Sequence, residues 1–388
     1  MRTRNTAWAA FSASSAVVIV SPADGTTVPL VNDLQKGVAA TASSAARERF
    51  LSEYKTGRVG LLIDDGLEVV DKDGDRIWRR PLPVTFTWRA TAGEEGPWKL
   101  AVATKADFSD ARTMTVRQSA ADIVRFVWTN ANLQAGVTYR WRVSAAGGER
   151  AESAFLTDDA VPRGIALEGR IANVRDLGGY VTEDGRHVRQ GLVYRGQGLN
   201  DNSRDGGITP GVSRLKDGDR ELLTNYLGIR TDLDLRSIKE TAGSRVSPMG
   251  EKVNLFTVNT LSYADIFSGR GKKAMAKGFR VFCRRENYPI YFHCAVGSDR
   301  TGTIGVLVDG ILGRTDEQIY NDYELPTFNQ NLARLRYCRK AAGMFGELDP
   351  KSSKLGGASI RENVVKYLHS IGLTDDELNA IRDIMLEK

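Results

Sequence analysis

The sequence predicts two domains, an all-β sandwich over residues 1–160 and an α/β layer fold over residues 161–388. Three observations lead to this division. The chain has 388 residues, more than twice the length of an average domain. The last of its six tryptophans is Trp141, so the two parts differ in composition. Short alternating strands dominate the first part, whereas strands followed by helices dominate the second.

Composition excludes several classes of protein. Hydrophobic residues make up 41% of the chain and charged residues 26%, which is typical of a globular protein and excludes a disordered chain or a polytopic membrane protein. Three cysteines exclude a disulfide-built scaffold. No run of about 18 apolar residues predicts a membrane span. The net charge of +6 favours anionic partners, but no Lys/Arg-rich block of the kind that binds nucleic acid is present.

The first domain is predicted from short strands with turn signals between them, at residues 17–20, 83–88, 98–102 and 139–143. Leu133, Gly136, Tyr139 and Val143 stand in the order of a tyrosine corner. The region therefore resembles a fibronectin type III-like sandwich, which we expect to bind an unidentified partner or a glycan.

Two segments interrupt the strands of the first domain. Residues 31–62 are rich in Ala, Glu and Arg in their central part and predict a helical insertion after the first strand. Residues 71–75 have the acidic pattern of a calcium loop, but the twelfth loop position is Leu82 where such a loop has Glu. We expect a hairpin turn there and no metal.

The second domain is predicted from strands and helices in succession. Strands are expected at residues 192–194, 229–235, 253–258 and 290–293, and an apolar helix at 301–312. Thr315 with Gln318, and Thr374 with Glu377, form capping boxes that predict the starts of two further helices.

Residues 289–302, with the sequence PIYFHCAVGSDRTG, are the most informative about chemistry. An apolar strand runs into Cys294, five residues follow, and a helix begins near Arg300. Such a loop collects backbone N–H groups at a helix N-terminus and forms an anion cradle. The positive electrostatic potential of these N–H groups also lowers the pKa of a thiol, so Cys294 is the predicted nucleophile. Arg300 is predicted to clamp two phosphate oxygens with its planar fork.

The remaining residues of this segment have supporting roles in the prediction. Gly297 allows the tight curvature of the loop, Thr301 can hydrogen-bond the sulfur, and His293 supports the loop without taking part in the reaction. No cofactor is expected, and no His/Asp cluster has metal-ligand spacing. The predicted phosphate-binding residues are Ala295, Val296, Gly297, Ser298, Asp299, Arg300 and Thr301.

HCAVGSDRTG resembles the signature loop of the cysteine-based protein tyrosine phosphatases. More narrowly, it is similar to the bacterial atypical branch, whose loop reads His-Cys-x-x-Gly-Lys-Asp-Arg-Thr-Gly. Residues 173–180 (NVRDLGGY) and 227–237 (LGIRTDLDLRS) match further motifs of that branch. The resemblance covers about 165–388. It implies a tyrosine-phosphatase fold and hydrolysis of phosphorylated proteins or small phosphate esters, most of all phosphotyrosine, through a phosphocysteine.

The sequence departs from that branch in three places. Ser298 stands where the branch has a lysine associated with activity on phosphoinositides. Residues 198–215 form an insertion rich in Gly, Asn and Asp. The N-terminal sandwich is also additional, and the resemblance then implies an exported bacterial enzyme, with a cytoplasmic location as the alternative. The basic start and apolar residues 7–20 fit either a remnant of an export signal or an ordinary N-terminal segment.

The general acid is left open by the sequence. Asp299 is the candidate that the family motif indicates, and Asp265, 29 residues before the cysteine, is the alternative. Asp234 and Asp176 are further candidates, although Asp176 with its neighbour Arg175 also fits a structural role at the Gly-Gly turn. Arg236 fits either a structural or a phosphate-facing role.

Two other functions remain as alternatives. An inositol-phosphate or phosphoinositide phosphatase would use the same loop in a more basic cleft, which Lys272, Lys273 and Lys277 would have to face. A surface-binding protein with a degraded phosphatase domain is the second alternative, against which the intact Cys294 and Arg300 argue.

Overall fold

The computed structural model describes residues 17–31, 36, 81–90, 96–117, 123–145, 148, 150–169, 171–201, 211–326, 335–336 and 338–388. Its contacts divide the chain into two units. The first comprises residues 1–28, 83–129 and 136–158, and the second comprises 29–82, 130–135 and 159–388. The predicted helical insertion at 31–62, apart from Val31 and Lys36, lies outside the described residues, as do the loop at 71–75 and the first sixteen residues.

The described strands of the first unit form two sheets. One sheet has the order β1-β3-β6 and is antiparallel, with β1 at Val17–Ser21, β3 at Val84–Ala90 and β6 at Ile123–Trp128. The second has the order β2-β8-β7-β4-β5, with bounds Thr26–Val28, Arg150–Thr157, Thr138–Ser144, Trp98–Ala103 and Arg112–Val116. Alternate residues of β3 are buried, as expected for a sheet with one face on the core. Large aromatic side chains fill that core, among them Phe86, Trp88, Trp98 and Trp141.

The second unit is built on a five-stranded sheet of order β12-β11-β13-β10-β9. The bounds are Asn254–Thr257 for β12, Thr231–Asp234 for β11, Ile290–His293 for β13, Val193–Gly196 for β10 and Arg175–Asp176 for β9. The first four strands are parallel and β9 is antiparallel to β10. Every residue of β10, β11 and β13 is buried, because parallel strands are covered on both faces.

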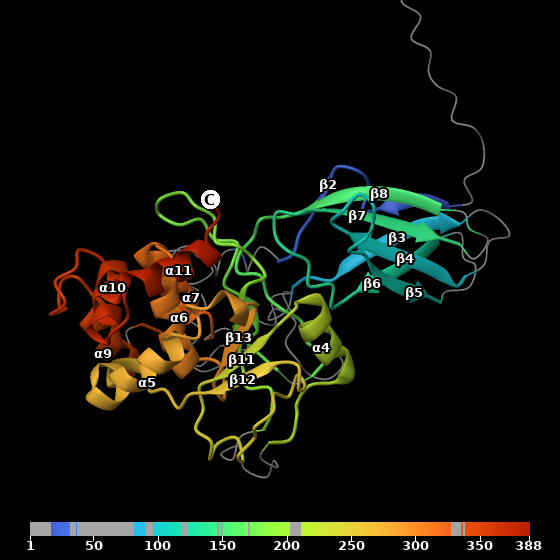
Figure 1. Cartoon of the computed structure of the whole chain (residues 1–388). Helices are drawn as coiled ribbons and strands as arrows, with labels where there is room; N and C mark the ends of the chain where they lie inside the picture. The colour runs from blue at the N-terminus through green and yellow to red at the C-terminus, as the bar shows by residue number, and fades with distance from the viewer. Residues whose placement is uncertain are drawn as a thin grey trace, which may run out of the picture. The chain divides into compact units, whose positions relative to one another are not determined.

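Helices cover both faces of this sheet, with α4 on one side and the remaining labelled helices on the other (Figure 1). Ile290 and Phe292 of β13 pack into the larger core with the C-terminal helices, whereas Tyr291 packs into the smaller core with Leu222 and Leu223. This alternation follows from the two-residue period of a strand. The helices are α4 (Asp217–Glu221), α5 (Gly269–Phe279), α6 (Asp299–Ile311), α7 (Asp316–Glu324), α9 (Arg339–Leu348), α10 (Ile360–Ser370) and α11 (Asp375–Met385).

The predicted helix boundaries agree closely with the structure. Both predicted capping boxes are present, at Thr315 before α7 and Thr374 before α11. The apolar helix α6 begins at Asp299, two residues before its predicted start, and almost all of it is buried. Among the described helices, none has the length and apolar character needed to cross a membrane.

Candidate active site

The loop that connects β13 to α6 holds the predicted nucleophile and most of the predicted phosphate-binding residues. Strand β13 ends at His293, Cys294 follows, and α6 begins at Asp299. Gly297 has a φ of 72°, which favours glycine. A Cβ atom at this position would lie 2.4 Å from the carbonyl oxygen of Gly196 on the neighbouring strand β10, so the loop can approach that strand only with glycine here.

The thiol of Cys294 is buried, with 2% of the residue exposed. Burial alone would raise the pKa of Cys294, but interactions with Thr301, Arg300 and the Val296 amide lower it below its ordinary value. The Thr301 hydroxyl is itself buried and makes no conventional hydrogen bond to any residue that the structure describes, so the sulfur is the acceptor within its reach. The arrangement favours a thiolate at neutral pH, the reactive form of cysteine.

Arg300 is held by a carboxylate that the sequence did not single out. Its NH1 and NH2 groups donate to the two carboxylate oxygens of Glu240 at 2.9 and 2.8 Å, and NH1 also donates to the Leu235 carbonyl at 3.2 Å. Guanidinium has five N–H groups. The side edge of the guanidinium consists of the Nε proton and the second NH2 proton. These two protons bond to no described residue. The edge that they form matches two oxygens of a phosphate.

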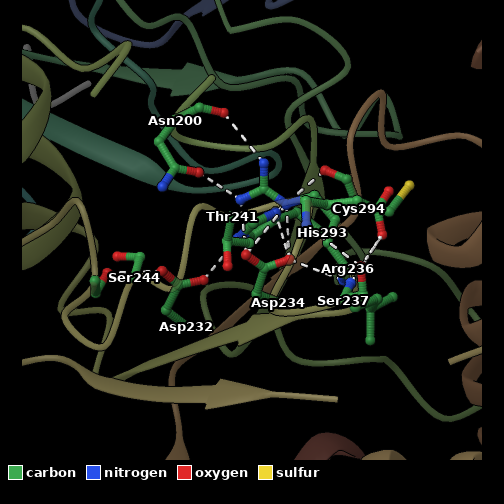
Figure 2. Close-up of polar contacts among 12 residues, drawn as sticks. Asn200, Asp232, Asp234, Arg236, Ser237, Thr241, Ser244, His293 and Cys294 are labelled. Carbon is green, nitrogen blue, oxygen red and sulfur yellow. Dashed lines mark hydrogen bonds and ion pairs between the residues drawn. The ribbon is translucent and has the colours of Figure 1, made fainter. Parts of the chain in front are cut away.

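A buried polar cluster lies behind Cys294 and positions the end of β13 (Figure 2). His293 Nε2 contacts Asp232 at 2.8 Å, and its Nδ1 donates to the Cys294 carbonyl at 3.2 Å. Burial would lower the pKa of His293, but Asp234 and Asp232 raise it. Both ring nitrogens therefore act as donors, as in a protonated imidazole. This geometry gives His293 a supporting position in the loop.

Arg236 belongs to the same cluster and is fully engaged within it. Its guanidinium donates to Asp234 at 2.7 and 2.9 Å and also bonds to the carbonyl and the side-chain oxygen of Asn200. Only 1% of the residue is exposed. Of the two roles that the sequence left open for Arg236, the structural one fits these contacts. Asp234 is itself 3% exposed, and its carboxylate is committed to Arg236, so it faces away from solvent.

A second buried network supports the loop from the side of β10. The Gly297 carbonyl accepts hydrogen bonds from Asn173 Nδ2 at 2.9 Å and from Arg195 NH2 at 3.2 Å. Arg195 and Arg175 both pair with Asp322 of α7. Burial would raise the pKa of Asp322, but these arginines hold it well below its usual range. Two cations therefore share one carboxylate directly behind the loop.

Asp176 takes the structural position that was expected for it. Its carboxylate accepts from the amides of Gly178 and Gly191 at 2.8 and 2.7 Å and from Arg163 at 3.0 Å. The residue is completely buried. Neither Asp176 nor Asp234 can therefore deliver a proton to a bound ester in this arrangement.

The two other acid candidates lie at different places relative to the loop. Asp299 is the first residue of α6, is half-buried, and accepts a hydrogen bond from the hydroxyl of Tyr263. Tyr263 itself is fixed by its amide, which donates to Thr303 Oγ1 of α6 at 2.9 Å. Asp265 lies two residues further along in the same short 3₁₀ turn, Tyr263–Phe267, and is exposed. Its carboxylate makes no hydrogen bond to the part of the chain that the structure describes.

Comparisons with known proteins identify the family of this chain. Residues 165–387 match the profile of the Tyrosine phosphatase family, which is more than half of the chain. The chain belongs to the tyrosine phosphatase family. A curated tyrosine-protein phosphatase from Nostoc commune is 30% identical over 138 residues, which cover 30% of this chain and 46% of the relative. The chain thus spans about half of that relative's length. The core catalytic domain of the PP-IP phosphatase SIW14 from S. cerevisiae is 17% identical, with 40% of this chain and 77% of that chain covered and a TM-score of 0.24.

Three residues of the candidate site were missed by sequence reasoning. Glu240 holds Arg300, Tyr263 holds Asp299, and Asp322 neutralises the arginines behind the loop. Asp322 lies within the sequence Asp-Tyr-Glu-Leu at residues 322–325, which also fits the tyrosine phosphatase resemblance, so the sequence contained a signal for it. Glu240 and Tyr263 lie in turns without a motif, and only the folded chain brings them to the loop. Among the described residues, no group of His, Cys, Asp and Glu could hold a metal ion.

Proposed function

We propose that this phosphatase hydrolyses phosphate monoesters, with phosphotyrosine as the preferred substrate, through a phosphocysteine intermediate. One observation carries the proposal. The Cys294 thiol, whose pKa is lowered, begins a loop that ends in Arg300, and the guanidinium of Arg300 keeps one bidentate edge free of described partners. Nucleophile and anion clamp are thus held together in front of a helix N-terminus.

In the first step, the thiolate of Cys294 attacks phosphorus as the bond to the leaving oxygen breaks. The free edge of Arg300 and the loop amides hold the three non-bridging oxygens, where charge is redistributed in the transition state. Asp299 gives its proton to the leaving oxygen. In the second step, water attacks phosphorus, the S–P bond breaks with its electrons returning to sulfur, and Asp299 takes the proton from the water. Inorganic phosphate and the free thiolate result.

Asp299 is favoured over Asp265 as the acid because it lies in the loop itself and is oriented by Tyr263. The hydroxyl of Tyr263 donates to one carboxyl oxygen of Asp299 and so fixes the orientation of the carboxyl group. Asp299→Asn should slow esters with poor leaving groups about 100- to 10,000-fold, but p-nitrophenyl phosphate far less. Tyr263→Phe should show the same leaving-group dependence more weakly, and it should add nothing in the Asp299→Asn background.

The same series made with Asp265→Asn separates the two candidates, because only the true acid gives a leaving-group dependence. If Asp299→Asn slows both kinds of ester equally and weakens oxyanion binding, then Asp299 shapes the loop and the proton comes from another group.

The nucleophile is tested by Cys294→Ser and Arg300→Ala. We expect Cys294→Ser to abolish turnover while the protein still folds and binds tungstate, and Arg300→Ala to lose both rate and affinity. Turnover that survives in Cys294→Ser, or inhibition of the native protein by EDTA, would refute the mechanism. Comparison of a phosphotyrosine peptide with inositol hexakisphosphate and a phosphoinositide tests the substrate preference.

For the first unit we infer a fibronectin type III-like sandwich that binds a partner or a glycan, and for the whole chain export from a bacterial cell. The two sheets around an aromatic core support the first inference, and the presence of this additional unit, which the resemblance associates with exported bacterial enzymes, supports the second. A glycan array with the intact protein tests the first, and cell fractionation tests the second. Protein found only in the cytoplasm would contradict export.

A further inference from the structure

We propose that the cavity beside Asp299 binds a second anionic group of the substrate, carried by the leaving group of the ester. This inference rests on the proposed function and narrows its substrate class. The cavity has a volume of about 300 Å³. Its lining residues are Tyr263, Asp299, Tyr323, Cys338, Arg339, Lys340 and Ala341.

The position of the cavity connects it with the leaving group. A general acid must come within hydrogen-bond distance of the oxygen that it protonates. The atoms bonded to that oxygen therefore lie next to Asp299, whose side chain forms part of the cavity wall. Tyr263 and Tyr323 also line the cavity and supply aromatic surface against which an aromatic leaving group can pack.

The charge of the lining indicates what such a leaving group carries. Arg339 and Lys340 are exposed at the start of α9, and neither forms an ion pair or a side-chain hydrogen bond with the described part of the chain. Two arginines close to the site differ in this respect. Arg336 nearby pairs with Glu324 at 2.7 Å, and Arg300 pairs with Glu240. The two cations of the cavity are thus available to a ligand.

The net positive charge of the lining is larger in the form of the site that can donate a proton. The lining holds two cations and one carboxylate, and the carboxylate is Asp299. Asp299 has to be protonated to act as the acid, and in that state it carries no charge. The described lining of the cavity then carries two positive charges and no negative one. A carboxylate or phosphate on the leaving group is attracted there, whereas an amide of the same shape is not.

The lysines that the sequence indicated for a basic cleft are not part of this cavity. Lys272, Lys273 and Lys277 lie on α5, and none of them is among the lining residues. The charge selectivity of the cavity therefore depends on Arg339 and Lys340.

The test uses two phenyl phosphates that differ only in one charge. One carries a propionate side chain para to the phosphate and the other the corresponding propionamide, so that two methylene groups insulate the phenol from the carboxylate. We expect the intact protein to prefer the carboxylate in kcat/KM at low salt. Arg339→Gln and Lys340→Gln should each reduce that preference about two- to fivefold, as for a pair of exposed charges. High salt should reduce it as well.

Two controls separate this inference from the proposed function. Turnover of the propionamide ester should be unchanged in Arg339→Gln and Lys340→Gln, since neither residue belongs to the reacting loop. Lys351→Gln removes an exposed charge that lies beyond the end of α9 and should leave the preference intact. Equal kcat/KM for the two esters, or a preference that survives in both variants, would overturn the inference while leaving the phosphocysteine mechanism in place. Turnover that persists in Cys294→Ser would instead refute the proposed function.

Discussion

The ion pair between Glu240 and Arg300 allows one quantitative prediction about both stability and function. The substitution Glu240→Gln keeps the size and the hydrogen-bonding oxygen of the side chain but removes its charge. In the structure both oxygens of Glu240 accept from Arg300, and the side chain is only 7% exposed. The variant therefore leaves the guanidinium of Arg300, 16% exposed, without its counter-charge.

The size of the effect follows from the pKa of Glu240. Burial alone would raise this pKa, but the hydrogen bonds from Arg300 and the Ser237 amide lower it from 4.5 to about 2. That difference corresponds to at most about 3 kcal/mol of the free energy of unfolding. Because Arg300 is partly solvated, we expect a loss of about 1–2 kcal/mol. For a domain of this size such a loss lowers Tm by roughly 2–8 °C.

The contribution of Glu240 to the free energy of unfolding depends on pH. The pKa of Glu240 is lower in the folded than in the unfolded chain. Its contribution to stability is therefore complete above about pH 4.5 and is lost as the pH falls toward 2. The difference in stability between native protein and Glu240→Gln should be constant near neutral pH and should vanish over that acidic window.

Circular dichroism at 222 nm is the suitable assay, because the helices with described bounds all lie in the second unit. Tryptophan fluorescence would instead report mainly on the first unit, which contains the four tryptophans that the structure describes as buried. Glu377→Gln is a matched control. It removes a charge from an ion pair with Arg280, whose side chains are 27% and 46% exposed, and it retains a capping residue. Because that pair is exposed, we expect Glu377→Gln to lower the free energy of unfolding by less than about 1 kcal/mol.

The functional consequence of Glu240→Gln should appear in binding. The glutamine amide can accept only one of the two end-on hydrogen bonds, so the guanidinium of Arg300 is held less firmly and its side edge is less well oriented toward phosphate. Affinity for tungstate should fall, and KM should rise. If Glu240→Gln matches the native protein in Tm and in tungstate affinity at neutral pH, the ion pair neither stabilises the fold nor orients the arginine, and the reasoning is wrong.

Two further predictions concern the loop and its thiol. Gly297→Ala should reduce tungstate affinity and turnover at least tenfold, because the φ of 72° and the approach to the neighbouring strand both exclude a Cβ atom. Gly185→Ala is the control, since its φ is 85° but no atom lies within 4 Å of the added Cβ, so only stability should change. Iodoacetamide at pH 6–7 should modify Cys294 faster than Cys283, because the pKa of Cys294 is lowered whereas burial raises that of Cys283 to about 12. Peptide mass spectrometry reads out both sites, and equal rates would contradict the assigned thiolate.

Local sequence was sufficient to predict the elements that carry the loop. The apolar residues before Cys294 predicted strand β13 with its observed bounds, and Gly297 marked the turn that has to approach a neighbouring strand. The capping boxes located the starts of α7 and α11 because the box is a contact between residues only three positions apart. These predictions depend on contacts between residues that are close in the sequence, so the sequence alone is enough to recognise them.

Long-range partners could not be predicted in the same way. Glu240 lies 60 residues from Arg300, and Tyr263 lies 36 residues from Asp299. Their pairing depends on where the turns after β11 and β12 are placed in the folded sheet. Neither the periodicity nor the spacing of residues in the sequence predicts where these turns lie. The cavity near Arg339 was missed for the same reason, since it joins the start of α9 to the start of α6.

The buried networks behind the loop explain why residues so far from the cysteine belong to the same site. A trans peptide group carries its C=O and its N–H on opposite sides. The Cys294 carbonyl is held inward by His293, and the Gly297 carbonyl by Asn173 and Arg195. The amide that shares each of these peptide groups lies on the opposite side from its carbonyl, which is the side where we propose that phosphate binds. Orientation of the cradle is thus achieved before any ligand arrives, and its hydrogen bonds need no rearrangement during the reaction.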